Sequence, residues 1–204
     1  MTNRHRSHTG RDIALVAVFA AFITVCALLP AFPVGPAGVP ITFQTLGIYL
    51  TALVLGGKRG ALAALLYLVV GFIGLPVFAG GGAGIGTLAA PSAGYLVSYP
   101  IGAFIIGALG YSFLRRRRGN ASIVWQVIAA LAGFVFITAC GVAGMMINAH
   151  LSLPVALGAA ALYIPGDLIK AVIAALVALA VHRAFPALAA NGLATRPNDH
   201  ATNR

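Results

Sequence analysis

Long apolar runs, separated by short polar or Pro- and Gly-rich stretches, dominate the chain. The last run, residues 171–181, contains only Ala, Val, Ile and Leu. A helix of roughly 20 apolar residues crosses the hydrocarbon layer of a bilayer. The pattern therefore predicts six membrane helices, of which the second and third are short and need flanking residues to cross. The predicted spans are residues 13–29, 41–55, 61–75, 95–114, 122–147 and 162–182.

Proline and glycine mark where these helices are expected to end. Four prolines within residues 30–40 break the chain after the first helix, and Gly56 and Gly57 predict a tight turn before the third. The N-terminal residues resemble the charged start of a signal peptide, but no small-residue cleavage site follows, so we expect the first helix to be retained. The predicted organisation is an N-terminal arm, a six-helix membrane domain and a disordered tail, at residues 1–12, 13–185 and 186–204.

Basic residues fall on one side of this arrangement. The three connections predicted on the other side, residues 30–40, 76–94 and 148–161, contain no Lys, Arg, Asp or Glu. By the positive-inside rule the basic side is cytoplasmic, so both termini are predicted inside. The four arginines at 115–118 then anchor the topology beside anionic lipid, and a nucleic-acid patch is disfavoured because no aromatic residues interleave them. Twelve of the 13 Lys and Arg follow this rule: Arg4, Arg6, Arg11, Lys58, Arg59, Arg115, Arg116, Arg117, Arg118, Arg183, Arg196 and Arg204.

Composition excludes a soluble globular domain. Hydrophobic residues make up 60% of the 204 residues and charged residues 8%, with a mean hydropathy of +0.98; soluble domains are about 25% charged. The net charge of +10 arises from 13 basic and three acidic residues. Cys26 and Cys140 lie in apolar runs and the histidines show no ligand spacing, so we expect neither a disulfide nor a metal site.

The thirteenth basic residue, Lys170, lies near the outer end of the last predicted helix, three residues after Asp167. Residues three apart share a helix face. An ionisable side chain inside a membrane helix is energetically unfavourable and usually faces a cavity or a partner. The pair therefore predicts a binding site. The alternative is a structural role, in which the helix dipole favours Asp167 and Lys170 extends outward to water.

The predicted outer connection at residues 76–94 is rich in glycine. It has five glycines between Gly80 and Gly86, and it also carries apolar residues such as Phe78. It lacks the Lys-Ser/Thr that follows the glycines of a nucleotide-binding P-loop. We expect a compact re-entrant lid whose glycines let the backbone approach a ligand, in preference to a merely tight connection.

The second predicted helix opens with Thr42, Gln44 and Thr45 in an otherwise apolar context. Such side chains commonly form hydrogen bonds between membrane helices. Gln44 lies at the same predicted depth as Asp167, so a ligand contact is the second interpretation.

The first predicted helix carries a stripe of small residues, Ala14, Ala17 and Ala21, at spacings of 3 and 4. Small faces let membrane helices pack closely. The stripe predicts either a contact inside this protein or a docking face for another membrane subunit.

Four segments in order, "VPITFQTL", "GLPVFAGGGAGIG", "PSAGYLVSYP" and "IPGDLIKA", resemble the BioY family, the biotin-capturing subunits of energy-coupling-factor transporters. The resemblance covers residues 13–185. It implies a six-helix, all-α fold in the bacterial cytoplasmic membrane, with a pocket near the outer surface that outer loops close. It implies no enzyme activity and no ATP site or cofactor on this chain. The implied partners are a transmembrane coupling subunit and two cytoplasmic ATPases, with the alanine stripe as the docking face, although some members act alone.

The implied ligand is biotin, whose ureido ring has two N–H donors and one carbonyl acceptor and whose tail ends in a carboxylate. An aspartate accepts from an N–H, and a lysine donates to the ureido oxygen or to the tail. We expect the ligand contacts to come from Asp167, Lys170, Gln44, Tyr95, Phe78, Gly80, Gly81 and Gly82.

Three other functions remain open at this point. The same scaffold could carry another vitamin. An intramembrane enzyme could use Asp167 and Lys170 as an acid and base, but such enzymes usually have a His/Glu metal motif or a second carboxylate, and the chain contains no glutamate. A purely structural or channel protein leaves Lys170 and the glycine-rich loop unexplained.

Overall fold

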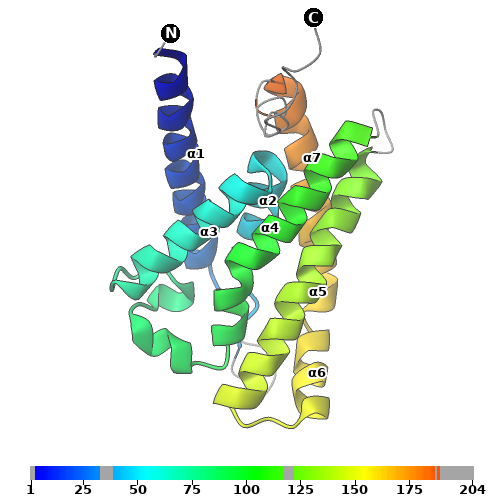
Figure 1. The fold of residues 1–204 in the computed structure, drawn as a ribbon. Helices are drawn as coiled ribbons and strands as arrows, with labels where there is room; N and C mark the ends of the chain where they lie inside the picture. Colours follow the sequence, from blue (N-terminus) through cyan, green and yellow to red (C-terminus); the bar gives the residue numbers. More distant parts are fainter. Residues whose placement is uncertain (1–2, 33–38, 117–121, 187, 189–204) are drawn as a thin grey trace, which may run out of the picture.

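The computed structural model describes residues 3–32, 39–116, 122–186 and 188, and it is helical nearly throughout (Figure 1). The predicted disordered tail, most of the proline-rich segment and the arginines at 117 and 118 lie outside the described residues. The helices are α1 (Asn3–Leu28), α2 (Gln44–Leu55), α3 (Gly57–Phe72), α4 (Ala93–Arg116), α5 (Ser122–Asn148), α6 (Leu153–Ala161) and α7 (Ile164–Ala184), with short 3₁₀ turns η1 (Ala79–Gly81) and η2 (Ile85–Ala89).

Among the described residues, four helices are long and apolar enough to cross a membrane: α1, α4, α5 and α7. Helix α2 has 12 residues, and α3 has 16 and begins next to Lys58 and Arg59. The prediction of an all-helical, multi-span protein is therefore confirmed, while the two helices that the sequence marks as short are short in the structure.

Two predicted boundaries differ from the structure. Helix α1 begins at Asn3, so the described part of the predicted arm continues the first helix. The predicted connection at residues 148–161 contains helix α6, which the sequence analysis missed. Pro154 lies in its first turn, where backbone N–H groups have no acceptor within the helix, so the missing N–H of proline costs no hydrogen bond. The alanine face formed by Ala156, Ala159 and Ala160 is buried, and this burial stabilises so short a helix.

Helix α2 is the central element, because nine of its twelve residues are buried. It contacts α1, α3, α4 and α7. The long pair α4 and α5 packs beside it, and the two helices approach closely at Gly94. A Cβ on Gly94 would lie 2.1 Å from the Cys140 carbonyl oxygen on α5, so this contact requires glycine.

The predicted tight turn between α2 and α3 is confirmed at Gly56, whose φ of 82° suits glycine. The carbonyl oxygen of Val54, at the end of α2, accepts a hydrogen bond of 2.6 Å from the Tyr111 hydroxyl. It also lies 3.2 Å from His182 Nε2. Helices α4 and α7 thus hold this corner in place.

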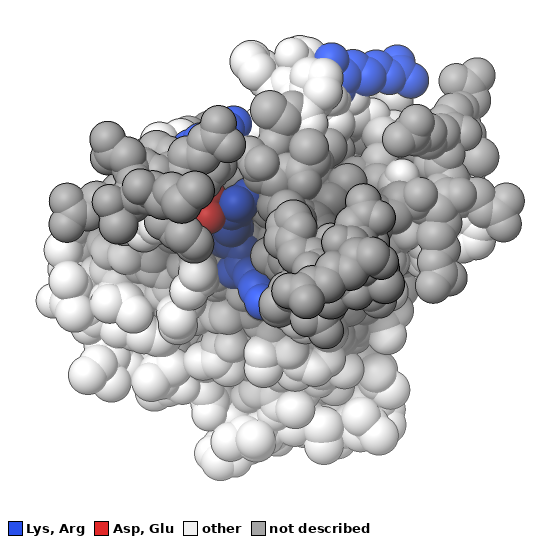
Figure 2. All heavy atoms as spheres, turned by 45° about the horizontal axis from the view of Figure 1, so that its top comes forward, with Lys and Arg blue, Asp and Glu red and all other residues white. Residues whose placement is uncertain are grey.

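The two ends of the molecule differ in charge. The start of α1, the α2–α3 corner and the ends of α4 and α7 lie at the end that carries both termini (Figure 1). Arg59 at the corner pairs with Asp12 of α1 at 2.9 Å. Figure 2 brings this end forward and shows Lys and Arg side chains gathered on it, whereas the lower part of the view is uncharged. Helix α6 and the segment with η1 and η2 lie at the opposite end.

Candidate ligand-binding site

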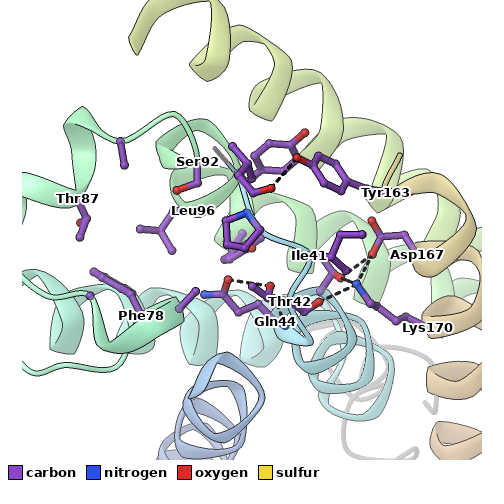
Figure 3. Close-up of a pocket in the computed structure, with 18 residues that line it drawn as sticks. Ile41, Thr42, Gln44, Phe78, Thr87, Ser92, Leu96, Tyr163, Asp167 and Lys170 are labelled. Carbon is purple, nitrogen blue, oxygen red and sulfur yellow. Dashed lines mark hydrogen bonds and ion pairs between the residues drawn. The ribbon is translucent and has the colours of Figure 1, made fainter. Parts of the chain in front are cut away.

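A cavity of ≈ 210 Å³ lies at the end opposite the two termini, where the starts of α2, α4 and α7 meet the η1–η2 segment (Figure 3). Apolar and aromatic side chains form most of its wall, and a few polar groups converge at one side, as in small-molecule sites generally. In the part of the chain that the structure describes, no three His, Cys or Asp side chains gather as metal ligands. The lining residues are Val39, Pro40, Ile41, Thr42, Gln44, Thr45, Phe78, Ala79, Gly82, Thr87, Ala90, Ser92, Tyr95, Leu96, Tyr99, Tyr163, Asp167 and Lys170.

Asp167 and Lys170 form an ion pair in the wall of this cavity, with Lys170 Nζ 3.0 Å from Asp167 Oδ1. Asp167 is 5% exposed and Lys170 9% exposed. Lys170 therefore does not extend outward to water, as the alternative interpretation of the sequence would require. Each charge is compensated locally, and this compensation makes two ionised groups tolerable at a buried position.

Lys170 also reaches the start of α2. Its ammonium donates to the Thr42 carbonyl oxygen at 2.7 Å and to Thr45 Oγ1 at 3.1 Å. With Asp167 Oδ1 as the third acceptor, all three N–H groups of the lysine are engaged. The dashed lines in Figure 3 show this convergence on the pair.

Gln44 is held from both ends of its amide. Its Nε2 donates to the Tyr67 hydroxyl on α3 at 2.6 Å, and its Oε1 accepts from Thr42 Oγ1 at 3.1 Å. The amide lines the cavity while bonding between helices. The interhelical hydrogen bond that the sequence predicts for Gln44 is therefore present, and its contact with a ligand stays a prediction.

Phe78 joins the glycine-rich segment to the helices. It is buried, lines the cavity and packs edge-to-face on Tyr67 and Phe72 at centroid distances of 5.5 and 5.4 Å. Its ring also lies on Gly71, where a Cβ would come within 2.1 Å of it. The aromatic ring of Phe78 therefore anchors the glycine-rich segment on α3.

The glycines of this segment lie at different places. Gly82 lines the cavity, whereas Gly80 and Gly81 are not among the lining residues. Both have positive φ, 67° and 78°, and no atom lies within 4 Å of where a Cβ would be. In this structure they provide the sharp turn after Phe78, and Gly82 alone of the three comes near the cavity.

A short stretch of chain before α2 closes another side. Phe32 and Ile41 exchange backbone hydrogen bonds of 3.0 and 2.9 Å. Tyr163, in the connection between α6 and α7, donates from its hydroxyl to the Val39 carbonyl oxygen at 2.9 Å. The stretch from Val39 to Thr42, which we call the strap, is thus tied to Lys170 on α7 and to Tyr163 just before that helix.

Comparison with known proteins decides the family. The BioY family model matches residues 1–187. The biotin transporter BioY of Rhizobium etli is 40% identical over 184 residues, which cover 88% of this chain and 97% of the relative. The chain belongs to the BioY family. The biotin transporter BioY of Rhodobacter capsulatus is also 40% identical, over 192 residues, covering 89% of this chain and 99% of that one.

A solved structure shares the fold of this BioY family member. It is the crystal structure of the S-component for biotin from an ECF-type ABC transporter, with a TM-score of 0.81 and 28% identity. The match covers 90% of this chain and 95% of that one. The relatives are transporters, so the sequence-level alternative of an intramembrane enzyme is set aside. The chain is a multi-pass protein of the bacterial plasma membrane.

Several cavity residues escaped the sequence analysis. Thr45 was noted only as a bonding residue of α2, and Tyr99, Tyr163 and Ser92 were not singled out. Tyr99 follows Tyr95 by one helical turn, so the predicted contact at Tyr95 was a signal for it. Tyr163 and Ser92 reach the cavity only through the tertiary fold, and no local pattern indicates them.

The alanine stripe faces outward. Ala14, Ala17 and Ala21 are exposed, whereas Ala20 and Ile23 form the buried face of α1. The stripe therefore makes no close helix contact within the described part of this protein. Of the two interpretations from the sequence, the internal contact is excluded for these residues.

Proposed function

We propose that this chain captures biotin at the outer face of the membrane and is the substrate-binding subunit of an energy-coupling-factor transporter. The cavity with its buried Asp167–Lys170 pair carries this proposal, because a pair of charges inside an apolar bundle indicates a polar ligand. The names of the relatives identify that ligand as biotin.

The donors and acceptors of the cavity suit the two ends of biotin. Asp167 accepts a hydrogen bond from a ureido N–H, and Gln44 retains an amide N–H that can bond a polar group of the ligand. The aromatic wall, including Phe78 and Tyr95, covers the apolar rings and chain. The tail carboxylate lies away from Asp167, because two carboxylates at close range repel each other.

We further propose six crossings with both termini in the cytoplasm. Helices α2 and α3 supply the second and third crossings, joined at the Gly56 turn. The basic residues at one end of the molecule support this orientation under the positive-inside rule. The cavity then opens toward the outside, where a capture subunit meets its substrate.

The coupling subunit is proposed to dock on Ala14, Ala17 and Ala21 of α1. Three small, exposed side chains on one helix face permit a close helix–helix approach inside the membrane. Two cytoplasmic ATPases joined to that subunit would supply the energy, since this chain is not an enzyme.

Ligand identification tests the function directly. The protein is purified from cells grown with a mixture of vitamins, and the bound small molecule is released and identified by mass spectrometry. We expect biotin. Retention of a different vitamin would support the alternative cargo on the same scaffold and would contradict the proposal.

A further inference from the structure

Thr45 bonds to both members of the ion pair. It lies on α2, 122 residues from Asp167 in sequence, and its hydroxyl donates to Asp167 Oδ1 at 2.6 Å. The same hydroxyl accepts from Lys170 Nζ at 3.1 Å. A threonine hydroxyl carries one proton, and here that proton is committed to the carboxylate.

The remaining hydrogen-bonding capacity of the cluster follows from its contacts. Lys170 has three donors, and they are engaged by the Thr42 carbonyl oxygen, Asp167 Oδ1 and Thr45 Oγ1. Both hydrogen bonds that described residues make to the Asp167 carboxylate end at Oδ1. Within the described residues no donor bonds to Oδ2, and Asp167 lines the cavity. The cluster therefore offers the ligand an acceptor and no spare donor (Figure 3).

We propose that Thr45 is a positioning residue that sets the specificity of this site. By bonding Oδ1 on the side of α2, it orients the carboxylate so that Oδ2 serves the cavity as an ionised acceptor. The site then selects ligands that present an N–H group and rejects isosteres without one, because such a ligand leaves Oδ2 buried and unpaired. This inference rests on the proposed function, since it concerns how the same site recognises the ureido group of biotin.

Thr45 acts through Asp167, and this dependence distinguishes positioning from a general structural role. Replacing Thr45 by valine keeps the shape of the side chain and removes the hydroxyl, whereas serine keeps the hydroxyl. If the hydroxyl works by orienting the carboxylate, its loss should matter little once the carboxylate is gone. When two residues are in contact, the amount by which the effects of their substitutions on binding fail to add measures this coupling.

The experiment measures biotin dissociation constants by calorimetry for folded, monodisperse protein in detergent. The variants are Thr45→Val, Thr45→Ser, Asp167→Asn and the double variant Thr45→Val/Asp167→Asn. Thr24→Val is the matched control, because among the described residues the Thr24 hydroxyl bonds only within α1, to the Ala20 carbonyl oxygen. Each protein is also titrated with a biotin derivative methylated at both ureido nitrogens, which has no N–H donor.

We expect Thr45→Val to weaken biotin binding about tenfold, or about 1.4 kcal/mol. In the Asp167→Asn background the same substitution should change affinity less than about twofold. Thr45→Ser and Thr24→Val should bind like wild type. The preference for biotin over the methylated derivative should fall in Thr45→Val. Should Thr45→Val fail to fold, Thr45→Ala serves for the same comparison.

Two results overturn the inference about Thr45. One is unchanged affinity and preference in the variant without the hydroxyl. The other is an equal loss with and without Asp167, which shows a structural effect that does not act through the carboxylate. If instead wild type does not bind biotin, or Asp167→Asn binds it normally, the proposed function itself fails at this site.

Discussion

The Lys170 ammonium donates a hydrogen bond of 2.7 Å to the Thr42 carbonyl oxygen, which joins the ion pair of α7 to the last residue of the strap. The strap, from Val39 to Thr42, lines the cavity. The same charged group therefore contributes to the polar wall of the site and to its closure.

Tyr163 provides the second tie of the strap, so removal of its hydroxyl should loosen the closure. We expect Tyr163→Phe to accelerate biotin release about two- to tenfold, because a net hydrogen bond is worth about 0.5–1.5 kcal/mol. Stopped-flow measurement of dissociation checks this result. Tyr111→Phe is the control, because it removes a hydrogen bond to Val54 at the opposite end and should lower stability without accelerating release. Unchanged release in Tyr163→Phe would show that the strap does not close the site.

Close contact with a coupling subunit should be lost when the exposed stripe on α1 is enlarged. We expect Ala17→Phe and Ala21→Phe to bind biotin normally and to fail in co-purification with the coupling subunit, since bulky side chains separate closely packed membrane helices. Val135→Phe is the control, because Val135 is 64% exposed and lies on α5, which does not pack against α1. Loss of biotin binding with assembly intact would contradict docking at this face.

The proposed topology predicts which residues a membrane-impermeant thiol reagent can reach. In a variant without Cys26 and Cys140, a cysteine at Leu88 in η2 should be labelled in intact cells. A cysteine at Lys58 should be labelled only after the membrane is opened, because the basic α2–α3 corner is predicted to be cytoplasmic. Labelling at position 58 from outside would contradict the orientation.

The close approach of α4 and α5 predicts a stability effect at Gly94. A methyl group there would meet the Cys140 carbonyl oxygen, so we expect Gly94→Ala to destabilise the protein by about 1–3 kcal/mol, the usual range for overpacking. Thermal unfolding in detergent gives the comparison. Gly158→Ala on α6 is the control, since no atom lies within 4 Å of its Cβ position, and it should be neutral or slightly stabilising. Equal stability of the two variants would be inconsistent with the close contact.

The sequence predicts the parts of this structure that depend on local pattern. The long apolar runs correspond to the four long helices, Gly56 marks the turn after α2, and the Asp167–Lys170 spacing places both side chains on one face. Helix α6 was missed because its nine residues are too few for a membrane span and lie in a segment without charges. In this case the start signal, Ser152 at the N-cap with Pro154 two residues later, was a better guide than length.

Non-local contacts account for what the sequence could not predict at the site. Thr45 and Asp167 are adjacent only because α2 and α7 pack side by side, and Tyr163 reaches Val39 across 124 residues of sequence. The glycine cluster predicts a tight loop, but its composition does not indicate that Gly82 would line the cavity while Gly80 and Gly81 form the turn. Those positions depend on Phe78, which fixes the loop on α3.

The most direct measurement for the whole account is the titration of folded, monodisperse Asp167→Asn and Lys170→Gln proteins with biotin beside wild type. Asp167 supplies the acceptor for the ligand, and Lys170 holds that carboxylate and the Thr42 carbonyl oxygen in place, so both charges support binding. Hydrogen bonds to charged groups are worth about 1.5–3 kcal/mol, and about 1.4 kcal/mol is tenfold in affinity. We predict that each variant loses at least about tenfold. Unchanged affinity in both, with the proteins merely less stable, would show that the pair has a structural role and that biotin binds elsewhere.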